Sequence, residues 1–277
     1  MNNHNFKSIG IIGIGLIGGS FAKAFYDKNI DVYGLDTNVN TLAKAADSYV
    51  FEGLTNNLND FLDFPLDLIY ICLPVKSTIE VLKSIAEKGV KIPITDAAST
   101  KRSICESAKS LKLNFVGGHP IAGKEVSGFE NSEKKMLNGA YHILIESENK
   151  QLQEALKILH LDIGMKIGIM DEKKHDSIFG LISHFPHLIA FALIDFVESE
   201  NIEALSFTGG GFKDFTRIAK SDPVMWTHIF FDNKDILLKY IDKYIDELLK
   251  WKNAINEENL DIMKEMISNV KALREAL

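Results

Sequence analysis

The residues best suited to chemistry begin with three glycines, Gly13, Gly15 and Gly18, which follow an isoleucine-rich run and open a helical pattern. In such a strand–turn–helix unit the first glycine allows a tight turn and the second lets a pyrophosphate approach the backbone. The third lets helix and strand pack closely. Free N–H groups at the helix start then attract phosphates. We therefore expect a dinucleotide site at this turn, including Leu16 and Ile17.

An acidic residue supports the same interpretation. The next predicted strand ends in Asp36, 18 residues after Gly18, where a carboxylate can hydrogen-bond ribose hydroxyls. Asp36 would repel a 2′-phosphate and no arginine follows it directly, so NAD is favoured over NADP. Leu73 and Pro74, at the end of another predicted strand, complete the expected cofactor contacts. The alternative is a glycine turn that only packs, with Asp36 capping a helix.

Two further stretches supply groups for the reaction itself. "DAASTKRS" places Ser99 and Thr100 just past a strand, where a parallel sheet presents its ligand crevice. His119 also follows a short strand, between Gly118 and Pro120, and a histidine exchanges protons near neutral pH. Helix capping by Ser99 and a hydrogen-bonded loop histidine are the alternatives.

The elements that must position these residues alternate between strands and helices. This order is typical of an α/β fold, with a doubly wound parallel sheet covered by helices on both faces. The predicted strands are Ser8–Ile12, Asp31–Leu35, Leu68–Leu73, Ile92–Thr95, Asn114–Val116, His142–Ile145 and Lys166–Ile169. Helical patterns cover Leu16–Lys28, Ser77–Lys88 and Lys101–Ser110.

The pattern becomes entirely helical from about Asp171. A long helix follows, which Pro186 is expected to bend. Two apolar stripes at helical spacing come later. They are Leu237, Ile241, Ile245 and Leu248, then Ile262, Met266, Val270, Leu273 and Leu277. We predict a Rossmann-type NAD-binding domain over residues 1–170 and an all-helical domain over residues 171–277.

Composition narrows the class of protein. The chain has 277 residues and a formal charge of −7, which gives no electrostatic footprint for nucleic acid. The two cysteines, Cys72 and Cys105, form neither a disulfide framework nor a metal-ligand spacing, so we expect no metal and a reducing compartment. The most apolar stretch, residues 188–194, is too short to span a membrane. We expect a cytoplasmic protein without membrane or nucleic-acid partners.

Five segments together resemble the prephenate dehydrogenase family. They are "GIGLIGGSFAKAF", "DAASTKRS", "GGHPIAGKEVSGFENS", "SHFPHLIAFAL" and "GGGFKDFTRIAKSDPVMW", in that order. The first is shared by many enzymes, whereas the other four are specific together. The resemblance implies NAD-dependent oxidative decarboxylation of prephenate to 4-hydroxyphenylpyruvate, in tyrosine biosynthesis.

The resemblance also implies roles for individual residues. His119 matches the catalytic histidine that accepts the substrate hydroxyl's hydrogen bond, and Ser99 matches a serine close to it and to the nicotinamide. Arg217 matches an arginine that grips a substrate carboxylate, which suits a guanidinium fork. The other substrate-binding matches are His184, His187, Glu125 and Gly210, with His184 favoured over His187.

Each match has a simpler alternative. Arg217 could form a surface ion pair with Asp214 or Asp222, and Glu125 could pair with Lys124. Trp226 matches a pocket position but is more simply a core aromatic residue.

The resemblance also implies a homodimer through the helical domain. The two apolar stripes fit that, although each could be buried within one chain. Other functions stay open: arogenate dehydrogenase, a catalytically silent NAD-binding regulator, or another two-domain dehydrogenase of the β-hydroxyacid type.

Overall fold

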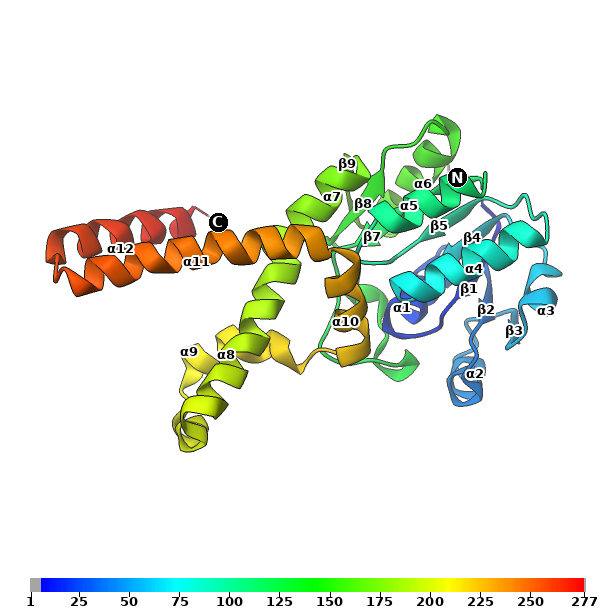
Figure 1. The fold of residues 1–277 in the computed structure, drawn as a ribbon. Coiled ribbons are helices and arrows are strands. Elements are labelled where there is room, and N and C mark those ends of the chain that lie inside the picture. Colours follow the sequence, from blue (N-terminus) through cyan, green and yellow to red (C-terminus); the bar gives the residue numbers. More distant parts are fainter. Residues whose placement is uncertain (1–5, 277) are drawn as a thin grey trace. The chain divides into compact units, whose positions relative to one another are not determined.

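The computed structural model describes residues 6–276. They divide into two compact units, with the boundary between Asn233 and Lys234. The larger unit begins with an α/β domain and continues into helices (Figure 1). The predicted domain boundary at 170/171 falls inside this unit, between a strand and a helix. The assignment of NAD binding to residues 1–170 and of a separate helical domain to residues 171–277 stays a prediction.

A parallel sheet forms the centre of the α/β domain. Its strand order is β3-β2-β1-β4-β5-β6, the doubly wound order of dinucleotide-binding folds. The strands are β1 (Ser8–Ile12), β2 (Asp31–Leu35), β3 (Gly53–Thr55), β4 (Leu68–Ile71), β5 (Ile94–Asp96) and β6 (Phe115–Val116). The first two match their predicted bounds. β3 was not predicted, since three residues are too few to show an alternating pattern.

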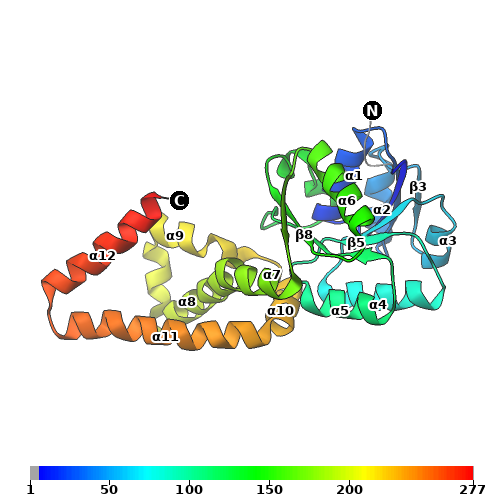
Figure 2. The same cartoon turned by 90° about the horizontal axis from the view of Figure 1, so that it is seen from above.

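Helices cover both faces of this sheet because its strands are apolar on both sides. In β4, Leu68 and Tyr70 belong to one buried cluster, whereas Ile69 and Ile71 belong to a second. Figure 2 shows the two layers of helices on opposite sides of the sheet. The helices of the first cluster are α1 (Leu16–Tyr26) and α6 (Lys150–Asp162). Those of the second are α3 (Leu58–Leu62), α4 (Val75–Glu87) and α5 (Arg102–Ser110), while α2 (Val39–Ala46) packs beside Ile14 through Ala45.

A second, three-stranded sheet follows the first along the chain. Its strands are β7 (Gly118–Pro120), β8 (Tyr141–Ile145) and β9 (Lys166–Met170), in the order β7-β8-β9. The prediction that residues 142–145 and 166–169 join the parallel sheet was therefore wrong. The physical reason is that β7, too short to predict, pairs antiparallel with β8 and draws it into a separate sheet.

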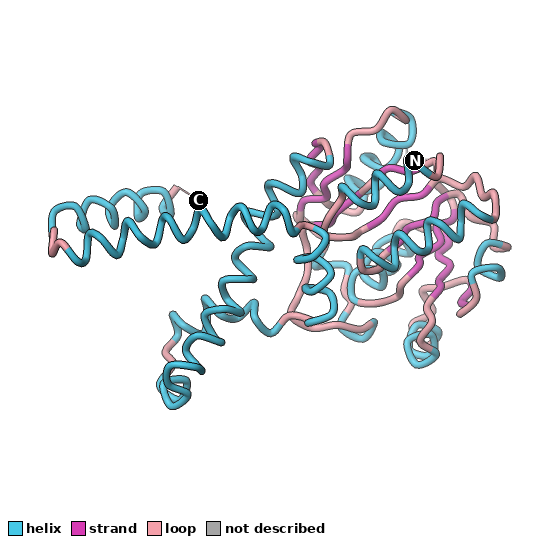
Figure 3. The backbone as a smooth tube through the Cα atoms, viewed as in Figure 1, coloured by secondary structure: helices cyan, strands magenta, loops and turns pink. Residues whose placement is uncertain are grey.

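Beyond β9 the described residues form helices and loops and no strand (Figure 3). The helices are α7 (Glu172–Phe179), α8 (Phe185–Asn201), α9 (Gly210–Thr216) and α10 (Pro223–Asp232). A π-helical segment, Gly180–His184, joins α7 to α8 just before Pro186. Proline has no N–H to donate, and the wider π turn accommodates that missing hydrogen bond.

The smaller unit consists of two helices, α11 (Lys234–Asn256) and α12 (Leu260–Glu275). Much of both apolar stripes is exposed in the single chain: Leu248 is 50% and Leu273 72% exposed. Leu277, the last residue of the second stripe, lies outside the described residues.

The helical segment Glu172–Phe207 is long and apolar enough to cross a membrane on length and composition, and 28% of its most apolar stretch is buried. This corrects the expectation drawn from residues 188–194 alone. A single such helix is weak evidence for a membrane, because a core helix of a soluble protein passes the same test.

Candidate functional site

The glycine turn combines two glycines that the fold requires with one that it does not. Gly13 has a φ of +91°, and a Cβ there would lie 2.6 Å from the carbonyl oxygen of Cys72. A Cβ on Gly18 would overlap the carbonyl oxygen of Gly13. Gly15, at the start of α1, would meet nothing within 4 Å. The open space over a helix N-terminus fits the pyrophosphate of a dinucleotide.

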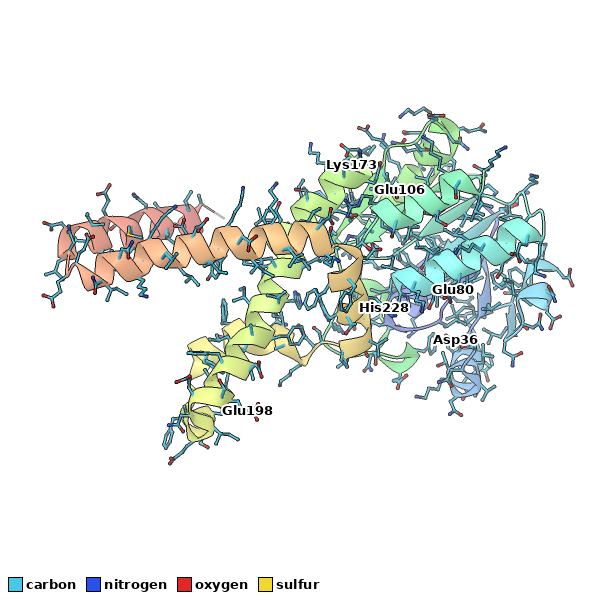
Figure 4. The ribbon with its side chains drawn as sticks, viewed as in Figure 1. Asp36, Glu80, Glu106, Lys173, Glu198 and His228 are labelled. Carbon is cyan, nitrogen blue, oxygen red and sulfur yellow. The ribbon has the colours of Figure 1, made fainter. Side chains whose placement is uncertain are left out.

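Asp36 lies directly after β2, beside this turn, and is labelled in Figure 4. Its Oδ2 accepts the N–H of Ile14 at 2.9 Å, and its Oδ1 accepts the N–H of Asn38 at 2.9 Å. The helix-capping alternative fails, because Asn38 caps α2 with its own side chain. The carboxylate therefore fastens the glycine turn to β2.

Four neighbouring strands, β2, β1, β4 and β5, end at the same edge of the parallel sheet. Leu73 follows β4 and reaches the turn: its Cδ2 lies 2.7 Å from the position of a Cβ on Gly13. Pro74 precedes the first residue of α4. Ser99 follows β5 and is half-buried. The topology thus gathers the predicted cofactor residues and Ser99 on one edge.

The strand that carries His119 is held by a buried ion pair. Asp96 and Lys101, both fully buried, are hydrogen-bonded to each other. Asp96 Oδ1 accepts the N–H of Gly118 at 3.0 Å, and Lys101 Nζ donates to the carbonyl oxygen of Gly118 at 2.7 Å. The N–H and the carbonyl oxygen of Gly118, the residue before His119, are therefore both bonded to charged groups. Hydrogen bonds to charged groups are stronger than those between neutral groups.

His119 itself makes a hydrogen bond to a second histidine. Its Nδ1 lies 2.9 Å from Nε2 of His175, whose Nδ1 lies 2.8 Å from Oδ1 of Asp176. Asp176 also accepts the N–H groups of Lys101 at 2.8 Å and of Arg102 at 3.0 Å. Asp176, rather than Ser99, therefore caps the N-terminus of α5.

The electrostatics of this chain follow from burial and hydrogen bonding. Burial lowers the pKa of His119 well below its ordinary value and also lowers the pKa of His175. Burial alone would raise the pKa of Asp176. The hydrogen bonds from His175 and from the amides of Arg102 and Lys101 outweigh that effect and hold the pKa of Asp176 below its ordinary value. The arrangement holds one carboxylate and two neutral histidines.

His184 is joined to the same network through Asn233. The Nδ2 group of Asn233 donates to the carbonyl oxygen of Asp176 at 2.9 Å and lies 3.1 Å from Nδ1 of His184. Nε2 of His184 is buried and has no hydrogen-bond partner among the described residues. Burial lowers the pKa of His184 to about 4, while the nearby Asp176 and the backbone of Ser99 oppose that shift.

His187 lies in a different setting. Its Nδ1 is 2.8 Å from the carbonyl oxygen of Ser183, and its ring stacks on Trp226 at 3.6 Å between centroids. Trp226 is buried, as the core-aromatic interpretation expects, and its ring also meets His184 edge-on at 6.2 Å.

Arg217 and Glu125 form an ion pair, which joins the loop after β7 to the end of α9. Arg217 does form an exposed ion pair, but with Glu125 and not with Asp214 or Asp222. Lys124 pairs with Glu133 at 2.5 Å and not with Glu125. Arg217 remains 58% exposed and Glu125 31% exposed in their side chains. Gly210, the first residue of α9, is exposed, and a Cβ there would meet nothing within 4 Å.

Sequence reasoning missed several members of this network. They are Asp96, Lys101, His175, Asp176 and Asn233. The adjacent His175 and Asp176 gave no periodic or spacing signal, because their partners lie 56 and 75 residues away.

A separate groove of about 640 Å³ runs between α5, β8 and α7. Figure 4 labels Glu106 and Lys173, which line it. Its walls carry both signs of charge and none of the predicted site residues. We assign it no role in the chemistry.

Two family models together match most of the chain. The family model "Prephenate dehydrogenase, nucleotide-binding domain" matches residues 21–168, and "Prephenate dehydrogenase, dimerization domain" matches residues 171–269. A prephenate dehydrogenase of Lactococcus lactis is 33% identical over 98% of this chain and 77% of its own. A cyclohexadienyl dehydrogenase of Zymomonas mobilis is 30% identical over 98% of this chain and 96% of its own.

A solved structure is also closely similar. The crystal structure of prephenate dehydrogenase from A. aeolicus, in complex with hydroxyphenyl propionate and NAD+, superposes with a TM-score of 0.93. It is 34% identical, and the match covers 98% of each chain.

Proposed function

The chain belongs to the prephenate dehydrogenase family, and from that premise we propose how its residues carry out the oxidative decarboxylation of prephenate with NAD. The observation that carries the proposal is the continuous hydrogen-bonded chain from His119 through His175, Asp176 and Asn233 to His184. This chain supports a reaction in which His119 accepts a hydrogen bond from the substrate and His184 donates one, beside the sheet edge that suits a dinucleotide.

The cofactor site is the glycine turn with Asp36. The space over Gly15 and the free start of α1 suit the pyrophosphate, and Asp36 suits the ribose hydroxyls and disfavours a 2′-phosphate. NAD, when bound, accepts the hydride from C4 of the substrate ring. Leu73, Pro74 and Ser99 border this edge.

His119 binds the C4 hydroxyl of the substrate. Its Nε2 accepts the hydroxyl's hydrogen bond, which stabilises the positive charge that develops on the C–O group as the hydride leaves. The ring carboxylate departs as carbon dioxide, and its bonding electron pair completes the aromatic ring. The oxygen keeps its proton as the phenol of 4-hydroxyphenylpyruvate, so His119 ends the reaction neutral.

The two helical histidines differ in what they can offer a carboxylate. Asn233 donates to Nδ1 of His184, so the ring proton of neutral His184 is on Nε2. This buried donor has the backbone of Ser99 nearby but makes no hydrogen bond within the described part of the chain. His187 uses its Nδ1 proton on the Ser183 carbonyl oxygen, which leaves only an acceptor at Nε2. We therefore assign substrate binding to His184 and a packing role to His187, against Trp226.

Arg217 anchors a substrate carboxylate. Its guanidinium has five N–H donors, so its ion pair with Glu125 leaves others available. Glu125 orients the guanidinium at the exposed mouth of the site. Gly210, at the start of α9, keeps that side free of a side chain.

The helical region binds substrate and forms a homodimer. The exposed apolar residues of α8, α11 and α12 need a cover, and a second copy of the same helices provides one. Such a cover also accounts for the apolar helix Glu172–Phe207 without a membrane. We place the enzyme in the cytoplasm, with residues 1–170 for NAD and residues 171–277 for substrate and dimer contacts.

The experiment that tests the function is NADH formation by the purified protein with NAD and either prephenate or arogenate. We expect a clear rate with prephenate. A rate with arogenate alone would keep the mechanism and overturn the substrate. No rate with either, despite measurable NAD binding, would favour a silent NAD-binding regulator. A light-scattering mass equal to the monomer's 31.0 kDa would overturn the dimer.

A further inference from the structure

We propose that His175 is a positioning residue: held by Asp176, it fixes His119 in the tautomer whose Nε2 is unprotonated and faces the substrate hydroxyl. The proposal rests on the proposed function of His119. It assigns to the dipeptide His175–Asp176, which the sequence did not single out, a specific part in that chemistry.

The direction of each hydrogen bond follows from the fixed end of the chain. Backbone N–H groups can only donate, so the N–H groups of Lys101 and Arg102 require Asp176 to accept on both oxygens. These hydrogen bonds hold the pKa of Asp176 below its ordinary value, so Asp176 is a carboxylate and Nδ1 of His175, at 2.8 Å from it, is the donor.

The remaining bond is then determined. A neutral His175 with its proton on Nδ1 has a lone pair on Nε2, which can only accept. The atom 2.9 Å away, Nδ1 of His119, must therefore carry the proton. Nε2 of His119 keeps its lone pair, the state required to accept a hydrogen bond from the substrate.

The geometry restricts rotation of both rings. His175 is fully buried, and Phe179 lies against both imidazoles, with centroids 5.1 Å from His119 and 4.7 Å from His175. A flipped His119 ring would lose its acceptor in this apolar surround. An N–H group that loses its hydrogen-bond partner inside a protein is costly, so the geometry favours the ring orientation that keeps the bond to His175.

The charged and titratable groups near His119 come from several elements. Lys101 and Asp96 form an ion pair beside Gly118, and the charge of Lys101 contributes, after burial and His175, to the lowered pKa of His119. His184 is neutral at physiological pH because burial lowers its pKa to about 4. His142, on β8, is a further buried histidine near His119, and burial lowers its pKa. The Asp176 carboxylate is hydrogen-bonded to His175 at the far end of the chain from His119.

The test compares His175→Phe with His175→Gln. Phenylalanine keeps a ring but offers no acceptor, whereas the glutamine side-chain oxygen can replace Nε2 as acceptor for the His119 proton. We expect H175F to lose about 10- to 100-fold in kcat, the usual effect of removing an orienting hydrogen bond. We expect little change in KM for prephenate or in NAD affinity. The acid limb of the kcat/KM profile should move to lower pH, because protonated His119 loses its acceptor. H175Q should recover most of the rate and the profile.

The matched control is His160→Phe, the same substitution at a fully buried histidine that bonds Tyr70 and has no hydrogen bond to His119. H160F should lower stability and leave the pH profile of activity in place. The proposal is overturned if H175F keeps the wild-type kcat and profile, if H175Q is no better than H175F, or if H160F shifts the profile as much.

A measurement on the unmodified protein covers the case in which the His175 variants do not fold. Nitrogen NMR of histidine-labelled protein, with His119 assigned by its loss in H119N, reports the protonated ring atom directly. We expect the proton on Nδ1; a proton on Nε2 refutes the proposal. If the wild-type protein shows no prephenate-dependent NADH formation, the proposed function fails, and the NMR result still decides the tautomer.

Discussion

Replacing Gly15 with alanine should weaken NAD binding without lowering the stability of the apo protein. A Cβ at this position meets no protein atom within 4 Å, and the backbone, with φ −85° and ψ −153°, is extended and open to alanine. Removing a glycine restricts the unfolded chain, which stabilises a protein by about 0.4–1 kcal/mol where the native conformation tolerates the change. We therefore expect apo G15A to melt at or slightly above the wild-type temperature.

NAD binding should respond in the opposite direction. The added methyl group occupies the space where the pyrophosphate approaches the backbone, and we expect the Kd for NAD to rise at least about tenfold, or about 1.4 kcal/mol. At 100 times the wild-type Kd, NAD stabilises the native protein by about 2.7 kcal/mol, and a tenfold weaker site reduces this to about 1.4 kcal/mol. Thermal unfolding with and without NAD measures both quantities in one assay.

Two variants bracket this result. Gly211→Ala also adds a methyl group in open space, in α9, and should leave NAD affinity unchanged. Gly18→Ala places a Cβ against the carbonyl oxygen of Gly13 and should destabilise the apo protein. Wild-type NAD affinity in G15A would refute the placement of the pyrophosphate over Gly15. An unstable apo G15A would refute the claim that the fold does not require this glycine.

Three further predictions concern the site and the core. His119→Asn should lower kcat by about 10²–10⁴-fold with NAD affinity nearly intact, because a general base contributes that much; an unchanged turnover would remove His119 from the role. Arg217→Ala should chiefly raise KM for prephenate, as the loss of a carboxylate anchor does, and steady-state kinetics with an unchanged KM would contradict it. Burial lowers the pKa of His160 to about 4. Between this value and the ordinary value of about 6.5, the histidine is protonated in the unfolded state and neutral in the folded state. Stability should therefore be full above about pH 6.5 and fall by on the order of 3 kcal/mol toward pH 4, and His160→Phe should make the measured slope shallower.

The parts of the site that the sequence predicted are those set by local backbone chemistry. The glycine turn, Asp36 and the first two strands follow from short-range spacing, since a strand, a tight turn and a helix start lie within a dozen residues. Ser99 and His119 could be placed at strand ends for the same reason. Their roles needed the family resemblance, because a lone serine or histidine after a strand has several ordinary structural uses.

The remainder depends on contacts between distant segments. Lys101 was only the first residue of a predicted helical pattern, whereas the structure buries it fully against Asp96 and Gly118. His175 was not singled out in the sequence, and in the structure it lies on α7, which packs against α5, with its Nε2 2.9 Å from Nδ1 of His119. No periodicity reports such a pairing, because each partner is fixed by tertiary packing rather than by its neighbours in sequence.

Asp176 has both a structural and a functional role, so His175 is the better position for substitutions that test the network. The same carboxylate caps α5 through two backbone N–H groups and orients His175, while its backbone carbonyl oxygen accepts from Asn233. An asparagine side chain has one acceptor oxygen, and its NH2 group would face an N–H donor of α5 or of His175. Asp176→Asn would therefore disturb the helix cap and the orientation of His175 together. Activity lost in such a variant could not be divided between the two causes. Among residues 6–276, the His175 ring hydrogen-bonds to Asp176 and His119 and to no other residue. Substitutions at His175 therefore isolate the catalytic consequence of the network.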